Sequence, residues 1–163
     1  MKKLSKIVAL LLAGAMAMLM FTACSGGGGS EDKEAEEKVM SQIRGKSTSS
    51  LQNDKDLQKV AAAHLDEDLK GGISIFGHTL VGDVHVEGKD KEYLTITVTA
   101  NYTYTDTLLS AILTQISKKV STDANVDIQQ SGNWSKVGVV VKTSNTKSYV
   151  GIAFQIKNPN YKG

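Results

Sequence analysis

Three residues in one short stretch could act as metal ligands or as an acid–base pair. His78, Asp83 and His85 lie within eight residues, in the run SIFGHTLVGDVH. Imidazole and carboxylate groups bind zinc when three or four of them converge on one point. Asp83 and His85 would share one face of a strand, and a bend would have to bring His78 to them. The stretch therefore predicts either a weak metal site or ordinary polar positions of a small domain, and the second is favoured.

Other catalytic arrangements find little support. No serine lies in a Gly-x-Ser-x-Gly turn, and the single cysteine, Cys24, belongs to the leader region. Asp66, Glu67 and Asp68 are expected to be solvated carboxylates on the outer flank of a helix, with His64 on its apolar side as a core histidine. These patterns favour a protein without enzymatic activity, and they predict no cofactor.

Two aromatic or hydroxyl-rich features could contact a ligand. Trp134 precedes an apolar run, and residues 97–106 read TVTANYTYTD. Packing in the core is favoured for Trp134, because a single tryptophan before a core strand usually serves that purpose. For residues 97–106 we expect the exposed face of a strand followed by a turn that caps a helix.

The charge composition argues against a nucleic-acid partner. The chain has 19 basic and 17 acidic residues, and Arg44 is its only arginine. Loss of an N-terminal leader would remove Lys2, Lys3 and Lys6, which leaves 16 basic and 17 acidic residues. A nearly neutral protein without an arginine cluster lacks the basic surface that phosphates require.

The N-terminus has the form of a lipoprotein signal peptide over residues 1–23. A basic start is followed by an apolar stretch from Ile7 to Phe21, which is short for a membrane span, and then by Thr-Ala-Cys. The sequence Phe-Thr-Ala-Cys resembles the lipobox of bacterial lipoproteins, in which the cysteine becomes the lipidated first residue. We therefore predict lipid attachment at Cys24, with two or more acyl chains for stable anchoring, and a location outside the cytoplasm on a membrane of the bacterial envelope.

Residues 24–33 are expected to form a tether, and residues 34–163 a folded domain. The run SGGGGS (25–30) cannot bury apolar surface, and the charges that follow it favour an extended chain. Within the domain, the apolar spacing predicts helices at 34–44, 54–70 and 107–120 and strands at 84–86, 93–100, 136–142 and 147–157. Residues 73–78 are expected to be a short extended piece. Helices mixed with antiparallel hairpins, without β-α-β alternation, define the α+β class.

Three stretches, taken in order, resemble the bacterial branch of the CAP superfamily, the SCP-like extracellular domains. They are LQNDKDLQKVAAAHLDEDLKGG (51–72), FGHTLVGD (76–83) and NWSKVGVVVKTSNTKSYVGIAFQ (133–155). The resemblance implies a small α–β–α sandwich with a central antiparallel sheet and a cavity built from histidines and acids. His78 matches one cavity histidine. The positions of the family's second histidine and of its acid are occupied here by other residue types, with Asp123 the only acid near them.

These features predict a membrane-anchored lipoprotein whose divergent CAP-like domain is a binding or interaction module. Its partner would be a protein, a cell-wall component or a small lipid, besides the membrane itself. The first alternative is a metal-assisted hydrolase of peptide or cell-wall material, acting through His78, Asp83 and His85. A lipid carrier is the second alternative, since the resemblance suggests that role for some relatives.

Overall fold

The computed structural model describes residues 30–71, 81–103, 107–120, 125–144 and 146–162. These residues form a mixed α+β domain with an antiparallel sheet. The helices are α2 (Lys33–Lys46), α3 (Lys55–Gly71), α4 (Leu108–Val120) and the short 3-10 helix η1 (Ser131–Asn133). The strands are β1 (Ser30–Glu31), β2 (Val81–Glu87), β3 (Tyr93–Asn101), β4 (Trp134–Ser144) and β5 (Lys147–Lys157). The predicted α+β class is confirmed, and the predicted helices and strands are found within a few residues of their expected bounds.

The five strands form one sheet in the order β1-β4-β5-β3-β2. Every neighbouring pair is antiparallel. Two hairpins, β2–β3 and β4–β5, meet where β3 pairs with β5 along nine residues, from Tyr93 opposite Lys157 to Asn101 opposite Tyr149. Both hairpins were predicted, but their pairing through β3 and β5 could not be read from local sequence.

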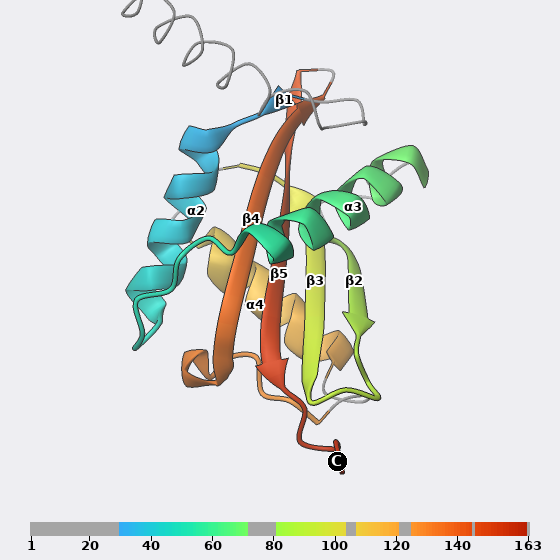
Figure 1. Ribbon diagram of the computed structural model, residues 1–163. Helices are drawn as coiled ribbons and strands as arrows, with labels where there is room; N and C mark the ends of the chain where they lie inside the picture. Colours follow the sequence, from blue (N-terminus) through green and yellow to red (C-terminus); the bar gives the residue numbers. More distant parts are fainter. Residues whose placement is uncertain (1–29, 72–80, 104–106, 121–124, 145, 163) are drawn as a thin grey trace, which may run out of the picture.

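Helices cover both faces of this sheet (Figure 1). On one face, α2 and α4 pack with the larger apolar cluster, which includes Val139, Ile152 and Phe154. On the other face, α3 lies across the strands and packs Leu57, Ala61 and Leu65 against Val140 and Ala153. Alternate residues of each strand serve the two faces, because successive side chains point in opposite directions.

Glycines allow α3 to lie very close to the sheet. A Cβ at Gly138 would be 2.4 Å from the backbone nitrogen of Gln58, and one at Gly151 would be 2.8 Å from the carbonyl oxygen of Ala61. Only a residue without a side chain fits at such a distance. The position of α3 relative to β4 and β5 therefore depends on these two glycines.

The helix α3 begins at a side-chain cap. The Leu57 amide donates to the Asp54 carboxylate at 3.0 Å, which satisfies one of the free amides at a helix start. The neighbouring Asn53 is engaged with β4 instead. Lys136 lies 3.4 Å from Asp54 as well. The pKa of Asp54 is lowered, mainly by the hydrogen bond from Leu57.

The outer edge of β4 is occupied by groups from the N-terminal part of the chain. The Asp32 amide donates to the Val141 carbonyl at 2.9 Å, and the Val141 amide donates to a Glu36 carboxylate oxygen at 3.3 Å. Asn53 both donates to the Val139 carbonyl and accepts from the Val139 amide. Capping an edge in this way removes free backbone groups that would otherwise pair with another chain.

Regular structure begins a few residues before the predicted boundary between tether and domain. Ser30 and Glu31 form β1 opposite Thr143 and Lys142, and α2 begins at Lys33. Asp32, which the prediction placed in the tether, caps α2 by accepting a hydrogen bond from the Ala35 amide. The predicted leader, Cys24 and most of the tether lie outside the described residues. Within the described part of the chain, no helix has the length and apolar character that crossing a membrane requires.

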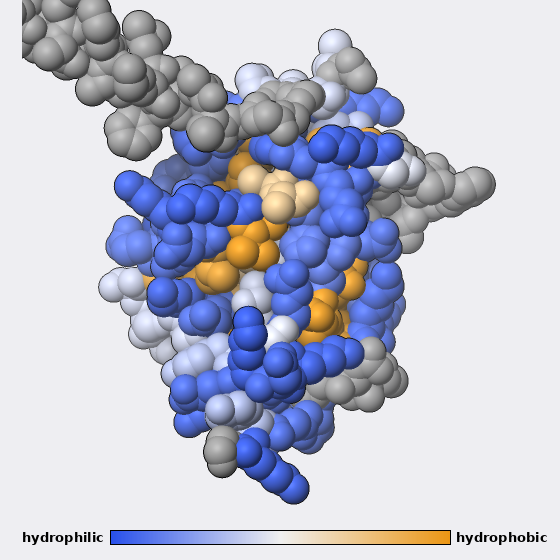
Figure 2. Space-filling view, turned by 45° about the vertical axis from the view of Figure 1, so that its right-hand side comes forward, coloured by the Kyte–Doolittle hydropathy of each residue, from blue (hydrophilic) through white to orange (hydrophobic). Residues whose placement is uncertain are grey.

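Two large hydrophobic side chains are exposed among the described residues, Tyr93 and Tyr161. The face seen in Figure 2 is mainly hydrophilic, with apolar residues in limited areas between polar ones. The domain thus buries most of its apolar side chains, and its exposed tyrosines stand out as exceptions.

Candidate functional site

The structure describes two members of the predicted cluster of His78, Asp83 and His85. These two, Asp83 and His85, do not lie together. Asp83 is exposed and lies 3.6 Å from Lys119 of α4, whereas His85 contacts Asp68 of α3 on the other face of the sheet. An irregular register between Val81 and Val84 explains why residues two apart serve different faces. His78 lies outside the described residues, as do the extended piece predicted at 73–78 and Asp123.

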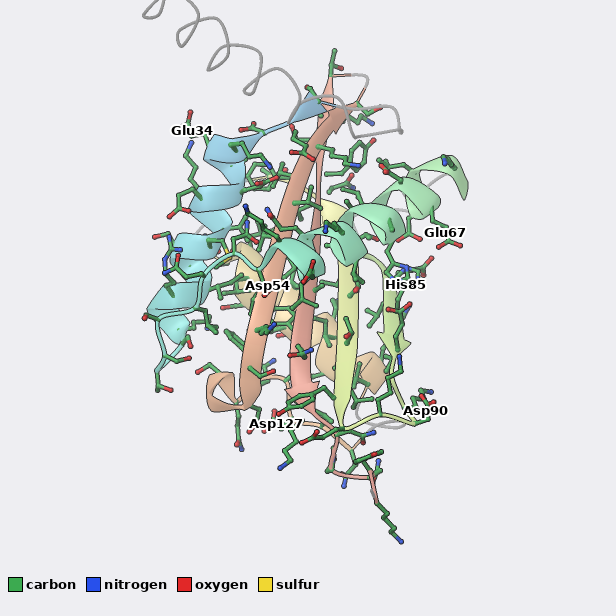
Figure 3. All side chains as sticks on the ribbon, viewed as in Figure 1. Glu34, Asp54, Glu67, His85, Asp90 and Asp127 are labelled. Atoms are coloured by element: carbon green, nitrogen blue, oxygen red, sulfur yellow. The ribbon has the colours of Figure 1, made fainter. Side chains whose placement is uncertain are left out.

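His85 instead belongs to a polar cluster between α3 and the β2–β3 hairpin. Its ring stacks on the ring of His64, with centroids 4.1 Å apart and planes inclined by 18°. The His85 Nε2 lies 3.1 Å from the Asp68 carboxylate, which also accepts a hydrogen bond from the Thr99 hydroxyl. In Figure 3, His85 lies beside the second half of α3, from which Glu67 also projects. This cluster joins α3 to two strands.

The expectation that Asp66 and Asp68 are solvated is wrong. The Asp68 side chain is 8% exposed because it faces the sheet. Asp66 lies 2.7 Å from the ammonium of Lys142, whose side chain is almost fully buried. Glu67, between them, is 75% exposed. Asp66 and Asp68 are both placed by long-range partners, and helix periodicity alone does not reveal these.

The threonines of β3 also depart from prediction. Thr97 and Thr99 are fully buried, although we expected residues 97–106 to begin with an exposed strand face. Both lie on the side of β3 that α3 covers, and Thr99 donates to Asp68. A paired hydroxyl such as that of Thr99 fixes the packing of one element on another, whereas the Thr97 hydroxyl is buried without a hydrogen-bond partner among the described residues.

The polar cluster has limited chemical capacity within the described residues. His64 Nε2 lies 3.4 Å from Glu87, while its Nδ1 is buried without a hydrogen-bond partner. No group of three or more metal-ligating side chains converges in the described part of the chain. The arrangement orients two imidazoles and holds α3 on the sheet, which is a structural role.

A groove lies at the end of the sheet where β3 and β4 begin and β5 ends. Its volume is about 490 Å³, within the range of roughly 300–1,000 Å³ that is usual for small-molecule sites. Buried Val126, Trp134 and Ile156 form an apolar floor. Exposed residues form the rim, and they are Tyr93, Asn125, Asp127, Gly132, Asn133, Ser135, Lys157 and Pro159.

Packing around Trp134 fixes the floor of the groove. The indole nitrogen donates to the Ile128 carbonyl at 3.0 Å, and the indole ring lies 5.1 Å from the ring of Phe154. Only 3% of Trp134 is exposed. The prediction that this tryptophan serves packing is confirmed, and its buried ring also shapes the base of the groove.

Several rim side chains retain hydrogen-bonding capacity. Asp127 accepts from the Gln129 amide through one oxygen, and Asn133 donates to the Asp127 carbonyl through its amide nitrogen. The second carboxylate oxygen and the Asn133 side-chain oxygen have no bond to another described residue. Sequence reasoning missed this site because residues 93, 125–135 and 156–159 are joined only by the fold. The signal available in the sequence was the polar Asn-Val-Asp and Ser-Gly-Asn-Trp runs.

The groove and the entry of the N-terminal chain lie at opposite ends of the sheet. Ser30 and Glu31 pair with residues 142 and 143, near the end of β4, whereas Trp134 begins that strand. Eight residues of strand, at about 3.3 Å each, separate the two places by roughly 26 Å. Figure 3 labels Asp127 at the groove end, and Figure 1 shows β1 at the other end.

No family model, curated protein or solved structure matches this chain significantly. Class assignment therefore rests on the α+β fold, and functional assignment on the groove and the N-terminal sequence.

Proposed function

We propose that this chain is a lipid-anchored lipoprotein of the bacterial envelope whose domain is a non-catalytic binding module, with the groove as its binding site. The position of the groove carries the proposal: it is at the end of the sheet opposite the point where residues 30 and 31 enter. A module anchored through Cys24 would turn this end away from the membrane, toward a ligand in the surrounding envelope.

The anchoring part of the proposal rests on Phe-Thr-Ala-Cys at positions 21–24 and on the glycine-rich run that follows. Two acyl chains hold a protein on a membrane stably, whereas one chain is marginal. The short tether would then keep the N-terminal end of the domain close to the bilayer.

A divergent CAP-like relationship is a further part of the proposal. It is supported by the three resembling stretches and by helices on both faces of an antiparallel sheet (Figure 1). If His78 is a remnant of the family cavity rather than a metal ligand, zinc calorimetry of the wild type and of His78→Ala should give the same result. Tight zinc binding that is lost in His78→Ala would contradict this interpretation.

Metabolic labelling tests the anchor. Cells that express the full chain are grown with an alkyne analogue of palmitate, and the wild type is compared with Cys24→Ala and with Ser25→Ala as the matched control. We expect label and membrane association for the wild type and Ser25→Ala, and neither the label nor cleavage at residue 24 for Cys24→Ala. An unlabelled wild type, or labelled Cys24→Ala, would overturn the proposal.

A further inference from the structure

We infer that the groove binds an uncharged oligosaccharide, of the kind found in the glycan strands of a cell envelope. The inference deepens the proposed function and rests on it for the location of the protein. It is carried by the composition, the charge and the hydrogen-bonding state of the groove.

The rim combines one exposed aromatic ring with small polar residues. Tyr93 is 39% exposed. Among the residues that the structure describes, Tyr161 is the only other exposed large hydrophobic residue. Tyrosine gives a rigid surface with apolar and polar parts, and asparagine, serine and glycine give adaptable hydrogen bonding. Asn125, Asn133 and Ser135 lie on the same rim. The apolar face of a sugar ring and its hydroxyl groups match these two kinds of surface.

The charge of the groove is balanced. Within the described part of the chain, Asp127 and Lys157 are the only ionisable side chains on its rim besides the phenol of Tyr93. One carboxylate and one ammonium leave no excess of either sign. Strongly charged ligands such as nucleotides are bound by clusters of cationic groups, which this rim lacks. A neutral ligand suits the site better.

Two backbone amides beside the groove are already paired, which argues against a peptide bound as an added strand along residues 133 and 134. The Asn133 amide donates to the Gln130 carbonyl at 2.9 Å, and the Trp134 amide donates to the Ser131 carbonyl. The rim also offers amide side chains for recognition, and these both donate and accept, as sugar hydroxyls do.

Binding of a defined sugar tests this inference. The full lipidated protein is purified in a zwitterionic detergent, since detergents with sugar headgroups would compete, and titrated calorimetrically with the β-1,4-linked tetrasaccharide of N-acetylglucosamine. Tyr93→Ala is compared with Tyr161→Ala, a matched change of the other exposed tyrosine. Tyr93→Phe keeps the ring, and far-ultraviolet circular dichroism verifies that each variant is folded.

We expect saturable binding by the wild type, with a dissociation constant raised about fivefold to tenfold in Tyr93→Ala, as loss of an aromatic contact implies. Tyr161→Ala and Tyr93→Phe should bind nearly as the wild type does. No binding at millimolar sugar, or equal affinities for Tyr93→Ala and Tyr161→Ala, would overturn the inference. Palmitate labelling separates the two proposals. Protein that is labelled but does not bind the sugar contradicts only the glycan site, whereas unlabelled protein contradicts the anchor.

Discussion

Glu36 is a buried carboxylate that connects α2 to the edge of β4. It is 3% exposed and accepts hydrogen bonds from Lys33, Gln58 and the Val141 amide. Desolvation raises its pKa above the usual value of 4.5, although the bonds from Lys33 and Val141 act in the opposite direction. A carboxyl group with a raised pKa binds its proton more tightly in the folded state than in the unfolded state.

Replacement of Glu36 by Gln should change how stability depends on pH. For Glu36 the folded pKa lies above the unfolded pKa, so its contribution is greatest below pH 4.5 and decreases as pH rises through the folded pKa. The free energy of unfolding of the wild type, relative to Glu36→Gln, should therefore fall as pH increases and then level off. Urea denaturation across this pH range measures the difference. Glu34→Gln, an exposed change in the same helix turn, should show no such trend; a rising wild-type advantage would contradict the assignment.

Asp66 neutralises a buried ammonium. Lys142 is 1% exposed, and its nitrogen lies 2.7 and 2.8 Å from the two carboxylate oxygens of Asp66. Asp66→Asn should lower the free energy of unfolding by about 3 kcal/mol, because it leaves a buried charge without its partner. The double change Asp66→Asn with Lys142→Met should restore part of this loss. Chemical denaturation measures each value.

Asp56→Asn is the control for this pair. Asp56 also lies near a lysine, Lys59, but its side chain is 87% exposed. An exposed pair contributes at most about 1 kcal/mol, so Asp56→Asn should change stability little. Similar losses for Asp56→Asn and Asp66→Asn would show that burial of Lys142 does not govern the effect.

At the scale of elements, the close contact between α3 and the sheet depends on the absence of side chains at Gly138 and Gly151. Gly138→Ala would place a Cβ 2.4 Å from the α3 backbone, so the helix or the strand must move. We expect a loss of about 1–3 kcal/mol, typical of overpacked sites, measured as a lower midpoint of urea unfolding.

Gly45→Ala provides the matched control. A Cβ at this glycine of α2 has no neighbour within 4 Å, and alanine is favoured over glycine in a helix by up to about 1 kcal/mol. This variant should be as stable as the wild type or more so. If Gly138→Ala proved equally harmless, α3 would not be held as closely as its distance from β4 implies.

Local patterns were sufficient to predict the elements but not their polar contacts. The stripe of Leu57, Ala61 and Leu65 and the alternation in β3 identify a helix and a strand from neighbours in sequence. Asp68 and Thr99 are different, because their burial depends on one another across 31 residues. A carboxylate or hydroxyl without a visible partner is assigned to the surface by default, and here that assignment failed.

The site was even less accessible to sequence reasoning. The groove joins the start of β3, the start of β4 and the end of β5, whose proximity follows from pairing between distant strands. His85 was singled out as a weak candidate metal ligand beside Asp83, whereas its contacts in the structure are with His64 and Asp68. Spacing within one stretch cannot show which helix covers which face.

At the scale of the whole molecule, the two ends of β5 should differ in their distance from the membrane. Lys147 and Lys157 are both exposed and lie at opposite ends of this strand, about 33 Å apart at 3.3 Å per residue. In the lipid-anchored protein, a fluorophore on Lys157→Cys should be quenched less by an acceptor lipid than one on Lys147→Cys. Fluorescence of vesicle-bound protein measures the difference. Equal quenching would mean that the groove is not held away from the bilayer.

The short pairing of β1 with β4 has a mechanical consequence. Two residues, Ser30 and Glu31, pair with Thr143 and Lys142 where the chain enters the fold. A pull on the N-terminal side would load these pairs first, followed by the bond from Asp32 to Val141. These backbone contacts would break one after another, while the hairpins and the groove remain folded. The few residues released at low force would lengthen the chain between the anchor and the domain. The force on the rest of the domain would rise only after that extension.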